Sequence, residues 1–82
     1  MSTFVVKGEV SRIALCPFPG PISYIRIDSK TYEFTELMPV RSVLAMTQAK
    51  DHVELTFEDK DHTLILVHIH NRLLEESAGY KS

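Results

Sequence analysis

The sequence lacks the residues and patterns that several common classes of protein require. Its single cysteine, Cys16, cannot form an internal disulfide, which excludes a disulfide-stapled fold and favours a reducing compartment. Its three glycines are scattered at positions 8, 20 and 79, so no glycine-rich loop is available to cradle a phosphate. Apolar runs such as residues 64–67 are too short to span a membrane, and the N-terminus shows no signal-peptide pattern. We therefore expect a cytoplasmic protein without a membrane segment.

Composition and charge are those of a small globular domain. The 82 residues include 44% hydrophobic and 24% charged side chains, so the chain can bury one core and has no length for a second. We predict a single domain over residues 1–82, with its core at residues 4–70 and a tail at residues 71–82. The formal net charge of -2 supplies no long-range positive field, which disfavours non-specific coating of nucleic acid.

A long bent strand is predicted at the start of the chain. Residues 3–15 alternate apolar and polar side chains, and the phase of this alternation slips once near Ser11 and Arg12. A slip of this kind, together with the interior Gly8, indicates a β-bulge or a coil that lets one strand serve two sheets. Residues 16–21 contain three prolines and predict a loop, because each proline removes a backbone donor and restricts the residue before it.

A hairpin and a helix are predicted next. Residues 22–28 and 31–35 are rich in β-branched and aromatic side chains, and residues 28–30 between them have turn chemistry. The period then becomes helical over residues 39–49, where the proline at position 39 suits the first turn of a helix. The apolar face of this helix is expected to consist of Val40, Val43, Leu44 and Thr47.

A second hairpin and a helical tail complete the prediction. Residues 52–58 alternate strictly, residues 59–61 have turn chemistry, and residues 63–69 form the returning strand. Asn71 is a candidate cap for a short helix over residues 72–78.

This order of elements resembles that of the OB-fold, a five-stranded Greek-key barrel, over residues 4–70. The predicted fold class is therefore mainly β: a five-stranded OB-like barrel with one helix between strands 3 and 4 and a short C-terminal helical tail. No particular family within that fold is matched by a motif. An open antiparallel sheet with the helix packed on one face is the alternative.

The resemblance implies a ligand surface on the second and third strands and in the loops beside them. Aromatic rings that stack on bases, next to cations that meet phosphates, are what binding of single-stranded nucleic acid requires. Aromatic side chains are also the ordinary filling of a small barrel, and strand alternation alone does not say which of them point outward. The candidate ligand-binding residues are Phe18, Tyr24, Arg26, Lys30 and Tyr32.

Histidines gather on the predicted second hairpin. Pairing the apolar residues of 53–57 with those of 63–67 sets His52 opposite His68, with Glu54 and His70 on the same face. These four side chains are the candidate metal ligands, since imidazole and carboxylate suit zinc. Their spacing matches no metal-binding signature, so we expect no metal and no cofactor, and we interpret this face as solvated or as part of an interface.

The same register places Leu64 and Leu66 on the outer face, where an isolated domain would expose them. Contiguous exposed apolar side chains usually mark an interaction surface, and either the tail or a partner subunit is expected to cover these. The candidate partner interface consists of Leu64, Leu66, Leu73 and Leu74.

Residues that would support catalysis are sparse. Cys16 lies among prolines with no histidine nearby in the sequence, and no serine has the context of an activated nucleophile. We therefore expect a protein that is not an enzyme. The leading hypothesis is a non-catalytic binding or assembly module that meets a protein partner or its own copy through the outer leucines or a free sheet edge. The alternative is a single-stranded nucleic-acid-binding domain.

Overall fold

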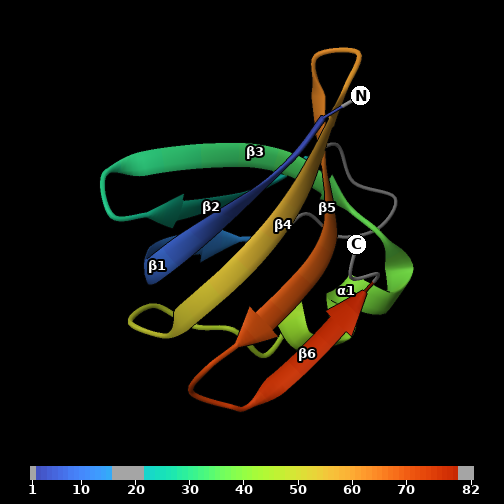
Figure 1. Ribbon diagram of the computed structural model, residues 1–82. Coiled ribbons are helices and arrows are strands. Elements are labelled where there is room, and N and C mark those ends of the chain that lie inside the picture. The colour runs from blue at the N-terminus through green and yellow to red at the C-terminus, as the bar shows by residue number, and fades with distance from the viewer. Residues whose placement is uncertain (1, 16–21, 80–82) are drawn as a thin grey trace.

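The computed structural model describes residues 2–15 and 22–79, and Figure 1 shows their arrangement. The strands are β1 (Ser2–Ala14), β2 (Ser23–Ile27), β3 (Lys30–Glu36), β4 (His52–Lys60), β5 (Thr63–Asn71) and β6 (Glu76–Gly79), and the helix is α1 (Met38–Leu44). Strands β1, β2, β3, β5 and β4 close into a ring in that order. The β3–β5 seam is parallel, and the other neighbours are antiparallel. The predicted mainly β fold, with a five-stranded ring and one helix between the third and fourth strands, is confirmed.

Strand β1 belongs to both halves of the ring. Residues 2–9 pair with β4, whereas residues 10–14 pair with β2. The register shifts between Val10 and Arg12, so Ser11 is the extra residue of a β-bulge, the first of the two alternatives that the phase slip allowed. The hydroxyl of Ser11 donates a hydrogen bond of 3.0 Å to the backbone carbonyl of Asp28, which ties the bulge to the β2–β3 turn. The bend at this point directs the two halves of β1 to different sheets.

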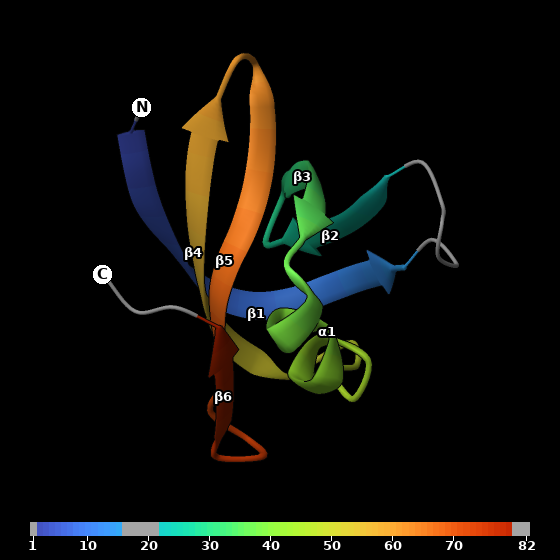
Figure 2. The same ribbon diagram turned by 90° about the vertical axis from the view of Figure 1, so that its right-hand side faces the viewer.

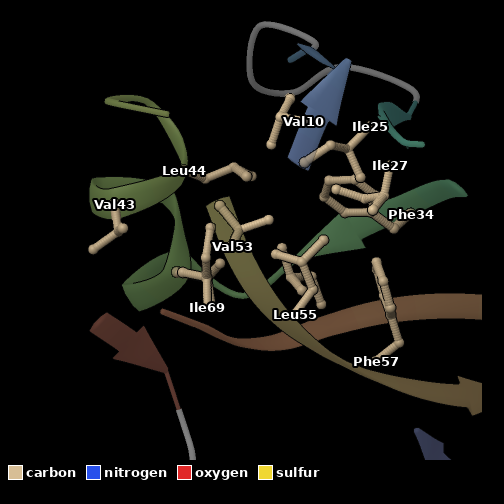
Figure 3. Packing of buried hydrophobic residues seen from close by; sticks show 12 residues of the cluster. Val10, Ile25, Ile27, Phe34, Val43, Leu44, Val53, Leu55, Phe57 and Ile69 are labelled. Carbon is tan, nitrogen blue, oxygen red and sulfur yellow. The ribbon is translucent and has the colours of Figure 1, made fainter. Parts of the chain in front are cut away.

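The core fills the ring (Figure 3). Phe57 lies on the side of the core away from α1 (Figure 3), and its ring centroid is 5.5–5.6 Å from those of Phe4, Tyr32 and Phe34. Gly8 leaves the space that this packing needs, because a Cβ atom there would lie 2.6 Å from Cγ2 of Ile27. The buried hydrophobic residues are Val10, Ile25, Ile27, Phe34, Val40, Val43, Leu44, Val53, Leu55, Phe57, Leu66 and Ile69.

Helix α1 covers one end of the ring and packs against β5 and β6 (Figure 2). The four residues expected on its apolar side are all buried, and Pro39 lies in the first turn. The helix ends at Leu44, earlier than the expected residue 49, and the hydroxyl of Thr47 donates to the terminal carbonyl of Val43 over 3.0 Å. The part of the chain that the structure describes contains no helix long and apolar enough to cross a membrane.

The turn of the second hairpin lies later than predicted. Asp61 and His62 both have positive φ, 51° and 64°, as a two-residue type I′ turn requires, so the predicted turn at residues 59–61 is wrong. The later turn changes the pairing of the whole hairpin and sets Phe57 opposite Leu66. Leu66 therefore points into the core and is fully buried, which contradicts its expected place on the outer face.

A bulge in β5 reverses the orientation of its second half. The register shifts between Thr56 and Phe57, whose partners are His68 and Leu66, so Val67 is the extra residue. Because side chains alternate along a strand, the bulge returns His68 and His70 to the outer face while Ile69 and Asn71 point inward.

The tail is a strand and not the predicted helix. Residues 72–75 form a turn, and β6 then pairs antiparallel with the last part of β5, outside the closed ring. Asn71 does cap a backbone segment, because its side-chain oxygen accepts hydrogen bonds from the N–H groups of Leu73 (3.0 Å) and Leu74 (3.2 Å). An Asx-type turn of this kind offers the backbone an alternative to the first turn of a helix.

Asn71 joins the end of the hairpin to the segment that follows α1. Its amide nitrogen donates to Oγ1 of Thr47 over 3.1 Å and to Oδ2 of Asp51 over 3.0 Å. The same carboxylate oxygen accepts from the backbone N–H of Gln48. The side chain of Asn71 is completely buried, and those of Thr47 and Asp51 are nearly so. This polar cluster therefore satisfies its own hydrogen-bonding groups beneath the core.

Replacing Asn71 by leucine should lower the free energy of unfolding by about 2 to 4 kcal/mol, because the Asp51 carboxylate and the turn amides lose their buried partner. Urea denaturation measures the change. Arg72→Ala, an exposed substitution one residue further on, is the control and should change stability by less than about 0.5 kcal/mol. Equal midpoints for the Asn71→Leu variant and the parent protein would contradict the role given to this amide.

Candidate functional site

The predicted ligand-binding residues are divided between the two faces of the β2–β3 hairpin. Tyr24 and Arg26 are on the outer face of β2, since their neighbours Ser23, Ile25 and Ile27 are buried. Tyr32 lies on the inner face, where its ring stacks on Phe57 at an interplanar angle of 19°. The ammonium group of Lys30 lies 5.3 Å from the centroid of Tyr32. Phe18 lies outside the described residues.

Two arginines meet on the outer face of this hairpin. Arg12 is the direct cross-strand partner of Arg26, and Ala14 is the partner of Tyr24 in the next pair on the same face. Both guanidinium side chains are exposed and Tyr24 is half-buried. Arg12 was not among the candidate residues predicted from the sequence. The alternation after the bulge already placed its side chain on the face opposite to that of Ile13. We call Arg12, Tyr24 and Arg26 the basic patch.

The four leucines predicted as a partner interface do not form one surface. Leu66 is in the core, and Leu64 packs against the core from the edge. Leu73 and Leu74, with exposed fractions of 70% and 39%, lie in the turn at the other end of β5. The expectation that the tail or a partner covers outward-pointing Leu64 and Leu66 is therefore wrong, because the later turn rotates both side chains inward.

The predicted histidine constellation is also rearranged. His52, Glu54, His68 and His70 are on the outer face, and Glu54 is the cross-strand partner of His70. The partner of His68 is Thr56, four residues from His52 and so roughly 13 Å along β4, which contradicts the predicted pairing of the two histidines. His52 instead lies 3.8 Å from a carboxylate oxygen of Glu9. Among residues 2–15 and 22–79, no three histidine, cysteine, aspartate or glutamate side chains are arranged to hold a metal ion.

The N-terminal half of β1 has an open edge. Residues 2–9 pair with β4 on one side, and no other strand of the described residues pairs with them on the other. Figure 2 shows this half of β1 as the outer margin of the sheet that it forms with β4 and β5. A strand edge of this kind presents unpaired N–H and C=O groups to solvent.

The backbone hydrogen bonds identify which groups face the open edge. The N–H and C=O groups of Val10 both bond to residues 50–51, on the side of β4. Because the direction of these groups alternates along a strand, those of Thr3, Val5 and Lys7 point away from β4. We call these three residues the edge positions.

Apolar side chains accompany the open edge. Val5 has an exposed fraction of 55% and Phe4 of 37%, on opposite faces of the strand. The charge of Lys7, which would otherwise discourage pairing, lies over the outer face, with its ammonium nitrogen 3.7 Å from a carboxylate oxygen of Glu54. Of the devices that commonly protect an edge from association, the three edge positions lack a proline and carry one charge, that of Lys7. Alternation in the sequence predicted a strand over these residues, but it carried no information on whether a second strand lies beside it.

Comparison of the chain with protein-family models, with curated proteins and with solved structures finds no match. The open edge of β1 and the basic patch are the candidate functional surfaces among the described residues.

The basic patch places like charges directly opposite each other, which should cost stability. We expect Arg12→Glu to raise the free energy of unfolding by about 0.5 kcal/mol, since repulsion from Arg26 becomes attraction. Thermal or urea denaturation at low salt measures the gain. The double variant Arg12→Glu, Arg26→Glu restores a like-charged pair, so its free energy of unfolding should lack this gain. A single variant that is less stable than the parent would contradict the inferred repulsion.

Proposed function

We propose that this chain is a non-catalytic binding or assembly module that acts through protein–protein contacts at the open edge of β1. The observation that supports the proposal is the direction of the backbone groups at Thr3, Val5 and Lys7, which face away from β4 with no strand of the described residues beside them. An extended segment of a partner that adds to such an edge gains main-chain hydrogen bonds along its whole length. The exposed side chains of Val5 and Phe4 supply apolar contact on the two faces of the added strand.

The fold agrees with a binding role. The ring order β1-β2-β3-β5-β4, with the helix between β3 and β4, corresponds to the arrangement of the OB-fold, to which we propose that the domain belongs. In this fold, as in others, function resides in surfaces carried by the barrel and not in the barrel itself.

Site-specific photo-cross-linking in the producing cells tests the proposal. A photoreactive phenylalanine analogue at Val5 should give protein adducts, because a partner strand at the edge lies within reach of this side chain. The same analogue at Glu33, an exposed position on β3, is the matched control and should give few adducts. Equal yields at the two positions, or no protein adduct at Val5, would contradict a protein-binding edge.

A second function is favoured by the basic patch. A tyrosine ring beside two exposed arginines combines a stacking surface with phosphate-binding cations, and it lies on the strand that carries ligands in OB-folds. The adjacent like charges cost stability in the free protein, and a bound anion would relieve that cost. We therefore infer binding of single-stranded nucleic acid as the alternative role.

Titration of labelled single-stranded DNA and RNA pools tests this alternative. Binding should weaken steeply with salt, and Tyr24→Ala should reduce affinity by about 1 to 3 kcal/mol through lost stacking. Arg12→Glu should weaken binding further, whereas Lys60→Glu, a charge reversal at the far end of β4, should have a much smaller effect. Absence of binding to both pools at low salt would exclude the alternative.

A further inference from the structure

We propose that the partner at the open edge of β1 is a second copy of this chain, bound antiparallel about a two-fold axis at Val5. This inference rests on the proposed function and specifies its partner. Closed two-fold dimers are the commonest soluble oligomers, and they require a surface that is complementary to itself. The edge positions meet this requirement in one register better than in any other.

The backbone selects the register. In an antiparallel pair, two residues whose N–H and C=O groups face each other exchange two hydrogen bonds. With the axis at Val5, this residue pairs with its own copy and Thr3 pairs with Lys7 of the second copy, so all three edge positions are used. Moving the axis to Phe4 or to Val6 leaves one edge position of each chain without an edge position opposite.

A shift toward the C-terminus is disfavoured for a separate reason. An axis at Lys7 would set two ammonium groups directly opposite each other, which is destabilising. It would also set Val5 opposite Glu9, whose carbonyl already accepts a hydrogen bond of 3.3 Å from the N–H of Asp28. The open part of the edge therefore ends before Glu9.

The side chains agree with the axis at Val5. On the outer face, the two exposed Val5 side chains meet, and on the inner face Phe4 lies beside Val6 of the second copy. Both contacts remove apolar surface from water, including part of the exposed surface of Phe4, which already packs on Phe57 in its own chain.

The charges on the outer face are also complementary. Thr3 is the cross-strand partner of Glu58, and Lys7 is that of Glu54. Pairing Lys7 with Thr3 of the second copy therefore places the ammonium group between Glu54 of its own chain and Glu58 of the other, two strand spacings or roughly 10 Å away. A lysine side chain can extend across the small threonine, so each lysine is flanked by carboxylates from both chains.

Analytical ultracentrifugation of the full chain tests the proposal. We expect the weight-average mass to rise toward twice the monomer value between about 10 µM and about 1 mM, the range of a small interface. Val5→Lys places two positive charges on the axis and should raise the dissociation constant at least about tenfold. Thr56→Lys adds the same charge to the same face one strand further from the axis, and as the matched control it should retain association.

A second variant removes the backbone contact without disturbing β4. Val5→Pro deletes an N–H group that faces the open edge, where proline is tolerated, so the variant should fold and remain monomeric. Circular dichroism and thermal denaturation establish that each variant is folded. A folded Val5→Pro protein that still dimerises with unchanged affinity would overturn the proposal.

Disulfide trapping tests the register in a Cys16→Ser background. Across the axis, the Cα atoms of the two residues at position 5 should lie about 5.5 Å apart, so Val5→Cys should cross-link on mild oxidation. Lys7→Cys should not, because the two positions are separated by four residues, roughly 14 Å along the strands. Cross-linking at Lys7 and not at Val5 would overturn the register.

The outcomes separate this inference from the proposed function. A protein that stays monomeric at all concentrations, yet gives adducts at Val5 with a different protein, would overturn the homodimer and leave the protein-binding edge in place. A monomer without any protein adduct at Val5 would overturn both. Val5 adducts of twice the chain mass, together with concentration-dependent association, support both.

Discussion

The hydrogen bonds of the buried Asn71 carboxamide are the interaction that holds together the end of the structure where α1, β6 and the last residues of β5 meet. A single side chain donates to Thr47 and Asp51 and accepts from the two amides of the β5–β6 turn. It thereby joins the segment after α1 to the end of the second hairpin, far apart in the sequence. An amide can serve both sets because it carries two donors on one atom and an acceptor on the other. An aspartate would lack the donors, and an apolar residue would leave the Asp51 carboxylate buried with one partner fewer.

The bend in β1 is the constraint on which closure of the five-stranded ring depends. The bulge at Ser11 allows one strand to close the ring by pairing with β4 and then with β2. The same geometry leaves residues 3–7 without a second strand beside them among the described residues, because β2 diverges from this half of β1. Closure of the ring at one end and an open edge at the other are thus consequences of one inserted residue. The candidate protein-binding surface is not an addition to the fold but the part of β1 that closure does not use.

The two candidate surfaces differ in their physical cost. The open edge leaves backbone groups hydrated and apolar side chains exposed. Association with another strand would pair these groups and remove the apolar side chains from water. The basic patch instead opposes two cations across a strand pair, where a single acidic residue would stabilise the free protein. An anionic ligand bound between the two guanidinium groups would offset this repulsion. The overall charge of the chain, in contrast, favours a protein partner over a polyanion.

Local patterns in the sequence were sufficient for β1 to β5, for the irregularity near Ser11 and for the buried face of α1, because alternation and helical periodicity record which side chains avoid water, but they predicted a helix where β6 lies. They were not sufficient for the second hairpin. The type I′ turn at Asp61–His62 moves the partner of Phe57 by three residues, from Thr63 to Leu66, and the bulge at Val67 shifts the register by one more, so each reverses which face a side chain occupies. The burial of Leu66 therefore depended on the register of the hairpin, which sets it opposite Phe57. Tertiary structure alone also decided which neighbours each strand has. The exposure of the β1 edge and the meeting of Arg12 with Arg26 are properties of strand order, and alternation within one strand carries no information about the strand beside it.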